Sequence, residues 1–315
     1  MRWRGAQAFA AIVWLAIASP IMAADRTVAL PDGRKLNFFC LGKGSPTILL
    51  ESGWSADSRA WPKVLGPLAA STRTCAYDRA GSGRSDAGPL PRDGAAIARD
   101  LDAGLRAARI SGPFILIGHS AGGLYARHFA NLRARDVVGL LLVDSSVEHQ
   151  QRRLQTAFGP GAGSLDGLIA RARACLSAAS AGKISAEDPA TSACATEPPA
   201  AAQSRWEARL SELQTLDTST SSQLDAGRAS YGDMPVSTLS ATRGRPGPVA
   251  DVWLALHGEI AARSACGHSR LVAESGHLMM KDRPDAIIEA AQTLLAAARA
   301  NSCPFADLAA PPPAR

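Results

Sequence analysis

The chain has 315 residues, of which 34 are Lys or Arg and 28 are Asp or Glu, for a formal net charge of +6 at pH 7. Its basic residues form no run, and aromatic residues make up only 5% of the chain, so we expect no nucleic-acid partner. The length is sufficient for one large domain with a sizeable core.

Residues 1–24 are predicted to be a cleavable signal peptide. Arg2 and Arg4 precede the apolar stretch 6–18, and Ala23-Ala24 supplies small residues at the cleavage site. The apolar stretch is short for a membrane span, which needs about 20 residues. An uncleaved anchor is the alternative, but we expect no stable membrane anchor after cleavage. The chain is therefore predicted to be secreted or periplasmic.

An exported chain with six cysteines is expected to contain disulfides, although the pairing cannot be read from sequence alone. Cys175 and Cys194 would close a short loop, which would contribute about 3 kcal/mol. Cys266 and Cys303 bracket the last predicted strand and helix. The alternative is that some of the cysteines are buried free thiols.

The first half of the chain alternates between predicted strands and helices. A hairpin signal covers 28–40, with a Pro31-Asp32-Gly33 turn. It is followed by strands over 47–51, 74–77, 114–118 and 137–143 and by helices over 61–70 and 93–109. The apolar run 137–143 is the most continuous and is typical of a central parallel strand.

Residues 148–232 interrupt this alternation. The segment is rich in Ala, Ser, Gln and Arg, contains no convincing strand, and has amphipathic patterns over 165–176 and 205–216. Alternation then resumes with strands over 235–240 and 270–273 and helices over 249–262 and 284–300. We predict a core of residues 25–147 and 233–303, a helical cap of residues 148–232 and a disordered tail of residues 304–315.

The pentapeptide Gly118-His119-Ser120-Ala121-Gly122 lies between a predicted buried strand and a predicted helix. In this context a GxSxG sequence places its serine on a sharp, strained turn with the hydroxyl exposed. The first amides of the helix then point toward the space above the serine. Ser120 is therefore the candidate nucleophile, and the amide of Ala121 is a candidate oxyanion donor.

The hairpin, the strand–helix alternation, the GxSxG turn and the late insertion together resemble the α/β-hydrolase superfamily over residues 27–300. The resemblance implies an α/β fold with a mostly parallel eight-stranded sheet, flanking helices and a helical cap insertion. It also makes the second and fourth strands neighbours, so a Cys40–Cys75 disulfide is geometrically reasonable. The segment Asp78–Ser85 matches the DRxGxGxS loop of this superfamily, where the loop is mainly structural.

A serine nucleophile needs a base that is oriented by an acid. His277 directly follows the last predicted strand, where the resemblance implies the base, whereas the runner-up His268 precedes that strand. No carboxylate follows the strand 235–240, the usual place of the acid, until Asp251. We favour Asp144, at the end of the strand beside the nucleophile strand, and keep Asp251 as the alternative.

The second oxyanion donor should come from the loop after strand 47–51. That loop reads Ser52-Gly53-Trp54, so the amide of Trp54 is the candidate. The sequence contains no HExxH or paired CxxC pattern, and the mechanism implied by the resemblance needs no metal or other cofactor.

The resemblance thus implies an exported serine hydrolase that cleaves carboxylic esters through an acyl-enzyme, with a small-molecule ester as its substrate. A serine at the turn disfavours the haloalkane dehalogenase and epoxide hydrolase branches, which use an aspartate. Alternatives are a proline-releasing aminopeptidase, an acyltransferase, or an inactive binding protein of the same fold. The aminopeptidase would need acidic residues for the substrate amine, with Glu148, Asp166 and Glu207 as candidates. The oligomeric state is left open.

Overall fold

The computed structural model describes residues 24–195, 199–245 and 247–306. The predicted signal peptide, except for Ala24, and the part of the predicted tail after residue 306 lie outside the described residues. Among the described helices, none combines the length and the apolar character needed to cross a membrane.

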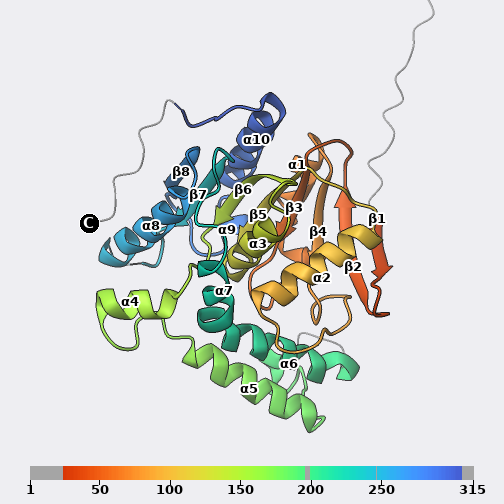
Figure 1. The fold of residues 1–315 in the computed structure, drawn as a ribbon. Helices are drawn as coiled ribbons and strands as arrows, with labels where there is room; N and C mark the ends of the chain where they lie inside the picture. Colours follow the sequence, from red (N-terminus) through yellow and green to blue (C-terminus); the bar gives the residue numbers. More distant parts are fainter. Residues whose placement is uncertain (1–23, 196–198, 246, 307–315) are drawn as a thin grey trace, which may run out of the picture.

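An eight-stranded sheet forms the centre of the molecule (Figure 1). Its spatial order is β1-β2-β4-β3-β5-β6-β7-β8. The pairings β1–β2 and β2–β4 are antiparallel, and the remaining pairings are parallel. The mostly parallel eight-stranded sheet predicted from the sequence is therefore confirmed. The strands are β1 (Ala24–Ala29), β2 (Lys35–Leu41), β3 (Thr47–Glu51), β4 (Thr74–Asp78), β5 (Phe114–His119), β6 (Val137–Val143), β7 (Val236–Ala241) and β8 (Gly267–Val272).

Helices cover both faces of the sheet because the inner strands are apolar on both sides. In β5, Phe114 and Leu116 face one core cluster, and Ile115 and Ile117 face the other, as the two-residue period of a strand requires. The first cluster is closed by α2 (Gly94–Ala107), α3 (Ala121–Leu132) and α8 (Gly247–Ala261), and the second by α1 (Leu65–Ala69) and α10 (Pro284–Ala300).

Several element boundaries differ from the sequence prediction, and two of the differences have a clear cause. The helix predicted over 61–70 begins only at Leu65, because Pro67 has no N–H to donate to the Lys63 carbonyl and is tolerated only in the first turn of a helix. The short helical turn η1 (Ser58–Ala60) precedes it. Strand β8 begins at Gly267 instead of residue 270, because its half-buried polar residues give no apolar signal.

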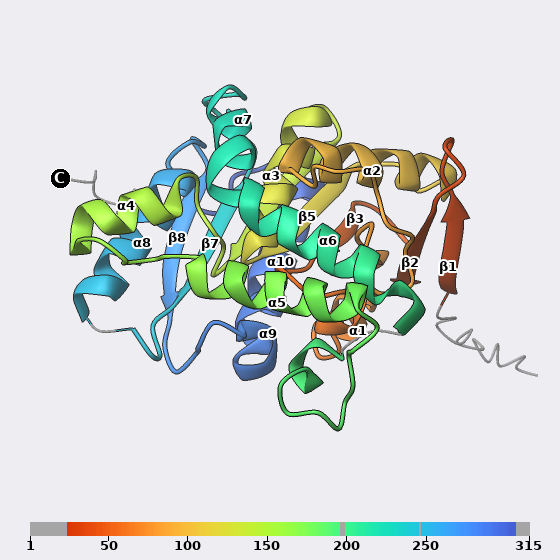
Figure 2. The ribbon, with the colours of Figure 1, turned by 90° about the horizontal axis from the view of Figure 1, so that it is seen from below.

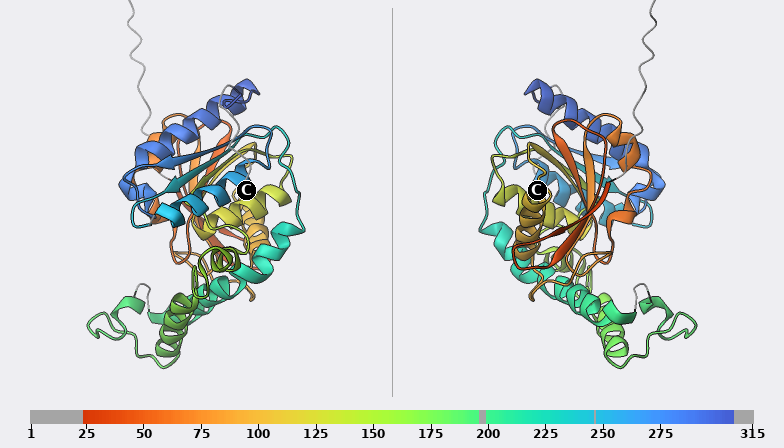
Figure 3. Two further views of the ribbon diagram at one scale, coloured as in Figure 1. Left: turned by 90° about the vertical axis from the view of Figure 1, so that its left-hand side faces the viewer. Right: turned by 90° about the vertical axis from the view of Figure 1, so that its right-hand side faces the viewer.

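The segment after β6 is helical, as its sequence pattern predicts. It contains α4 (Gln150–Phe158), α5 (Asp166–Ser180), the turn η2 (Ser192–Cys194), α6 (Pro199–Thr215), the π-helical turn η3 (Leu216–Thr220) and α7 (Ser221–Asp225). Helices α5 and α6 pack side by side (Figure 2). Figure 3 shows these helices gathered at one end of the layered body. We call residues 148–232 the cap.

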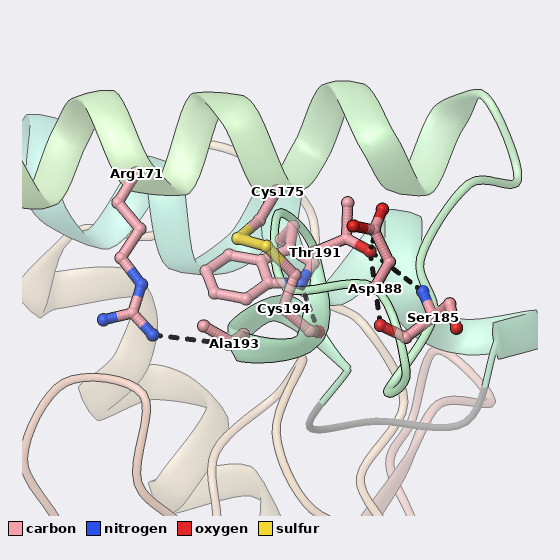
Figure 4. The surroundings of a disulfide bond; sticks show 8 residues. Arg171, Cys175, Ser185, Asp188, Thr191, Ala193 and Cys194 are labelled. Atoms are coloured by element: carbon pink, nitrogen blue, oxygen red, sulfur yellow. Dashed lines mark hydrogen bonds between the residues drawn. A yellow bond between two sulfur atoms is a disulfide. The ribbon is translucent and has the colours of Figure 1, made fainter.

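All six cysteines are paired. Cys40–Cys75 joins β2 to β4 at a point where the two residues are register partners, as the resemblance implied. Cys266–Cys303 joins the start of β8 to the segment after α10. Cys175–Cys194 lies within the cap, where it ties the loop after α5 back to that helix (Figure 4). Arg171 of α5 also donates to the carbonyl of Ala193, at 3.3 Å.

We predict that replacing Cys175 and Cys194 by alanine loosens this loop. The bridge spans 19 residues, so its removal should cost the cap about 3 kcal/mol of local stability. Trypsin should then cleave after the exposed Lys183 faster than in the wild type. The double variant of Cys266 and Cys303 is the control and should leave this rate unchanged. Equal cleavage rates in all three proteins would contradict the prediction.

Candidate active site

Ser120 occupies the turn between β5 and α3. Its backbone has φ 53° and ψ −130°, a conformation that non-glycine residues rarely adopt. The turn is held in place by hydrogen bonds from the Ser146 and Gly123 amides to the Ser120 carbonyl, both at 2.9 Å. A strained turn between strand and helix is the arrangement in which a serine hydroxyl projects from the sheet edge.

The two glycines of the pentapeptide allow α3 to pack closely on the sheet. A Cβ on Gly118 would lie 2.6 Å from the carbonyl oxygen of Gly122. A Cβ on Gly122 would lie 2.5 Å from the carbonyl oxygens of Glu51 and Ser52. A side chain at Gly118 would push α3 away from β5, and one at Gly122 would push it away from the loop after β3. These glycines therefore set the position of Ser120 relative to that loop.

His277 lies between Ser120 and Asp144. Its Nε2 is 3.1 Å from Oγ of Ser120, and its Nδ1 is 2.7 Å from Oδ2 of Asp144. An ionised carboxylate only accepts, so Nδ1 carries the proton and Nε2 is left to accept the serine proton. The His277 side chain is 47% exposed, so this end of the site is open to solvent.

Asp144 is fully buried at the end of β6, with a positive φ of 40°. Besides His277, its carboxylate accepts from both terminal nitrogens of Arg245 (3.0 and 2.8 Å), from Nε1 of Trp253 (2.8 Å) and from the Ala241 amide (3.0 Å). Burial alone would raise the pKa of Asp144, but the hydrogen bonds from His277 and Arg245 outweigh it and hold the pKa well below its usual range. The carboxylate is therefore ionised at neutral pH.

The alternative acid and the alternative base lie elsewhere. Asp251 is exposed on α8, and within the described residues the His277 imidazole bonds to Asp144 and Ser120 instead. His268 lies in β8, with its ring stacked 5.0 Å from the ring of Phe305.

Arg245 and Trp253, which donate to Asp144, were not predicted from the sequence. Arg245 lies in the loop after β7, the usual place of the acid in this superfamily. Its guanidinium also lies over the Trp253 ring, 4.8 Å from the ring centre. An arginine in place of the expected acid was the available signal. It could have indicated that this loop supports a carboxylate on the neighbouring strand.

The loop after β3 lies directly against Ser120. A Cβ on Gly53 would be 3.0 Å from Cβ of Ser120 and 3.0 Å from Nδ1 of His119. The amide of Ala121 is the first of α3 and has no partner within the helix. The Trp54 side chain donates from Nε1 to the carbonyl of Arg209 in α6, at 2.9 Å, so this loop also contacts the cap.

His119, the second residue of the pentapeptide, supports the His277 loop. Its Nε2 donates to the carbonyl oxygen of His277 at 2.8 Å, and the two rings lie 4.7 Å apart. Burial disfavours the imidazolium, and a charge on His277 would repel it, so the pKa of His119 is lowered to about 4. His119 is therefore a neutral donor at neutral pH.

Asp78 ends β4 and begins the segment Asp78–Ser85, and its carboxylate accepts from the amides of Ser58 and Arg84, both at 2.9 Å. These bonds tie two loops together and agree with the structural interpretation of this motif. No group of three or more His, Cys, Asp and Glu side chains within the described ranges is arranged to hold a metal ion.

Comparison with known proteins points to one family. The sequence model of the alpha/beta hydrolase family matches residues 48–290. The chain is 33% identical over 130 residues to an AB hydrolase superfamily protein of Gibberella zeae, which covers 39% of this chain and 40% of that protein. It is 33% identical over 103 residues to the putative carbamate hydrolase RutD of Azorhizobium caulinodans, covering 33% of this chain and 38% of that protein. The chain thus spans less than half the length of these curated relatives.

Solved structures share the fold. The epoxide hydrolase CorEH superimposes with a TM-score of 0.59 at 19% identity, covering 87% of this chain and 99% of that chain. A putative lipase of Acinetobacter baumannii superimposes with a TM-score of 0.62 at 16% identity, covering 89% of this chain and 93% of that chain. At such low identity these similarities establish the fold alone.

We predict that His119 makes the protein less stable in mild acid. Its pKa of about 4 lies below the ordinary 6.5, so the unfolded chain binds more protons between these values and stability falls as pH drops below 6.5. This contributes a loss of about 2 kcal/mol between pH 7 and pH 5. His119→Gln keeps an amide donor and should lose about 2 kcal/mol less over the same range, as measured by urea unfolding. An equal loss in both proteins would contradict the prediction.

Proposed function

The chain belongs to the alpha/beta hydrolase family, and we propose that within it this protein is a serine hydrolase acting on carboxylic esters. The observation that carries the proposal is the hydrogen-bonded series from Asp144 through His277 to Ser120, with distances of 2.7 and 3.1 Å. A serine whose hydroxyl contacts an imidazole that is oriented by a buried carboxylate is the arrangement that activates a serine nucleophile.

In the proposed reaction Ser120 Oγ attacks the ester carbonyl while His277 Nε2 takes its proton. The amides of Ala121 and Trp54 stabilise the oxyanion of the tetrahedral intermediate. His277 then returns the proton to the leaving alcohol, and a water molecule activated by His277 releases the acyl group from Ser120. Asp144 keeps its charge throughout and stabilises the imidazolium.

An apolar substrate group is favoured by the surroundings of the two proposed oxyanion amides. Ala121 belongs to a hydrophobic cluster with Leu124 of α3 and Leu216 of the cap, and Trp54 and Leu165 pack against that cluster. Leu278, beside His277, is 45% exposed. Such surroundings suit an ester with an apolar acyl or alcohol part better than a strongly charged one.

The aminopeptidase alternative has less support. Glu148, one candidate for binding a substrate amine, is buried and already paired with Arg127 and Arg263. Asp166 is exposed on α5, and Glu207 lies on α6. An acyltransferase would use the same residues with an alcohol in place of water. The binding-protein alternative rested on the missing acid after β7, and the contact between Asp144 and His277 weakens that argument.

We also propose that the protein acts outside the cytoplasm. Disulfides persist in oxidising compartments, and this chain has three of them. The predicted signal peptide over residues 1–24 is consistent with this proposal. A secreted or periplasmic protein without a stable membrane anchor is the expectation.

The proposed activity predicts turnover of p-nitrophenyl esters in preference to aminoacyl-anilides. Ser120→Ala should abolish ester turnover because it removes the nucleophile, without a change in thermal stability. A fluorophosphonate probe should label the wild type and leave Ser120→Ala unlabelled. Preference for the anilides would favour the aminopeptidase, and absence of labelling in the wild type would contradict serine hydrolysis. Product analysis with a competing alcohol separates hydrolase from acyltransferase.

The assignment of the acid predicts different effects for two matched substitutions. Asp144→Asn should lower kcat roughly 10³- to 10⁴-fold, because His277 loses the charge that orients and stabilises it. Asp251→Asn, on the surface of α8, should leave kcat unchanged. Steady-state kinetics on one ester, with thermal unfolding to verify both folds, makes the comparison. The reverse pattern would assign the acid to Asp251.

A further inference from the structure

Arg79, the second residue of the segment Asp78–Ser85, is a buried cation next to the site. The residue directly follows β4, and its side chain is 2% exposed. All five N–H donors of its guanidinium have an acceptor. Two of these contacts go to Glu212 of α6, at 3.3 and 3.2 Å, and one goes to Glu51, at 2.8 Å. The remaining two go to backbone carbonyls of the loop after β3.

The bonds to these two carbonyls determine the direction in which the Trp54 N–H of the loop after β3 points. Arg79 Nη1 donates to the carbonyl of Ser52 at 2.6 Å, and Nη2 donates to the carbonyl of Gly53 at 2.8 Å. The Gly53 carbonyl and the Trp54 N–H belong to one peptide unit. In a trans peptide these two groups point in opposite directions. A carbonyl fixed on Arg79 therefore turns the Trp54 N–H away from Arg79.

We infer that Arg79 is a positioning residue that holds the Trp54 amide in the orientation needed to bind the oxyanion. This inference rests on the proposed serine hydrolysis. Gly53 has no Cβ, so its backbone is unusually free to rotate. The Gly53 carbonyl also accepts from the Ala56 amide, but at the longer distance of 3.2 Å, so loss of the bond from Arg79 would leave one weaker contact to keep the Gly53–Trp54 peptide from flipping. The close contact of Gly53 with Ser120 means that a flip would remove the donor at the point where the oxyanion forms.

Charged and polar side chains around Arg79 hold its guanidinium in a fixed position. Glu51 and Glu212 face the guanidinium from the sheet and from the cap, Tyr77 donates to Glu51, and Tyr125 donates to Glu212 at 3.3 Å. Arg79 also lies over the Tyr125 ring at 5.1 Å. Burial raises the pKa of Glu51 to about 7, despite the charge of Arg79 and the hydrogen bond from Tyr77. A proton on Glu51 can therefore compensate part of the buried negative charge.

The test uses two variants, one that disrupts the paired donation to the two carbonyls and one that removes it. Arg79→Lys keeps the charge but replaces the planar fork by a single ammonium group, which cannot reach all of these acceptors. The double variant Arg79→Met, Glu212→Met removes Arg79 together with one of its two buried carboxylates, and replacement of a buried ion pair by apolar residues is often tolerated. Glu51 stays behind with its hydrogen bond from Tyr77, and its raised pKa of about 7 allows it to take up a proton. The matched control is Arg127→Lys, since Arg127 is equally buried and paired with Glu148 but does not touch the loop after β3.

We expect both Arg79 variants to lower kcat for a p-nitrophenyl ester roughly 10- to 100-fold while KM changes less than about threefold, because the donor acts on the transition state. Affinity for n-butylboronic acid, which forms a tetrahedral adduct on an active serine, should fall in parallel. Arg127→Lys should keep both values, whatever its effect on thermal stability.

Three results would overturn the inference. Folded Arg79 variants could keep wild-type kcat and boronate affinity, or they could change KM alone. In either case the fluorophosphonate probe still labels the wild type, so only the role of Arg79 fails. A wild type that is not labelled would remove the proposed function and the inference with it.

Discussion

The close approach of α3 to the sheet at Gly118 and Gly122 is the constraint on which the rest of the site depends. Backbone atoms occupy the space where side chains at these positions would lie. This packing forces Ser120 into its strained conformation and brings the first turn of α3 against the carbonyls of Glu51 and Ser52. Ser120 and the loop after β3 therefore form one packed unit, and neither can be shifted without the other.

Two buried charges flank this unit from opposite sides. Asp144 is held by Arg245 and Trp253 and presents one oxygen to His277. Arg79 is held by Glu51 and Glu212 and donates to two backbone carbonyls of the loop after β3. In both cases a charge removed from water is compensated by several directed hydrogen bonds, which is the condition for keeping it buried. Directed bonds also fix geometry, so both charges orient the groups they touch.

Much of the fold could be predicted from the sequence because its strands are apolar on both faces and are separated by clear turn signals. The runs 47–51, 114–118 and 137–143 correspond closely to β3, β5 and β6. Prediction was weaker where burial is incomplete. The polar strand β8 and the long cap helices α5 and α6 extend beyond their predicted limits, because only part of each carries an apolar pattern.

The sequence by itself determined the strand–turn–helix around Ser120 and the position of His277 after the last strand, since both depend on local pattern and chain order. Only the tertiary structure decided which carboxylate meets His277. Asp144 ends one predicted strand and Asp251 falls in the predicted helix 249–262, and packing alone places one of them against the histidine. The same holds for Arg245, Trp253 and Arg79. Their partners lie far away along the chain, and no local sequence pattern specifies contacts that arise only when strands and cap come together.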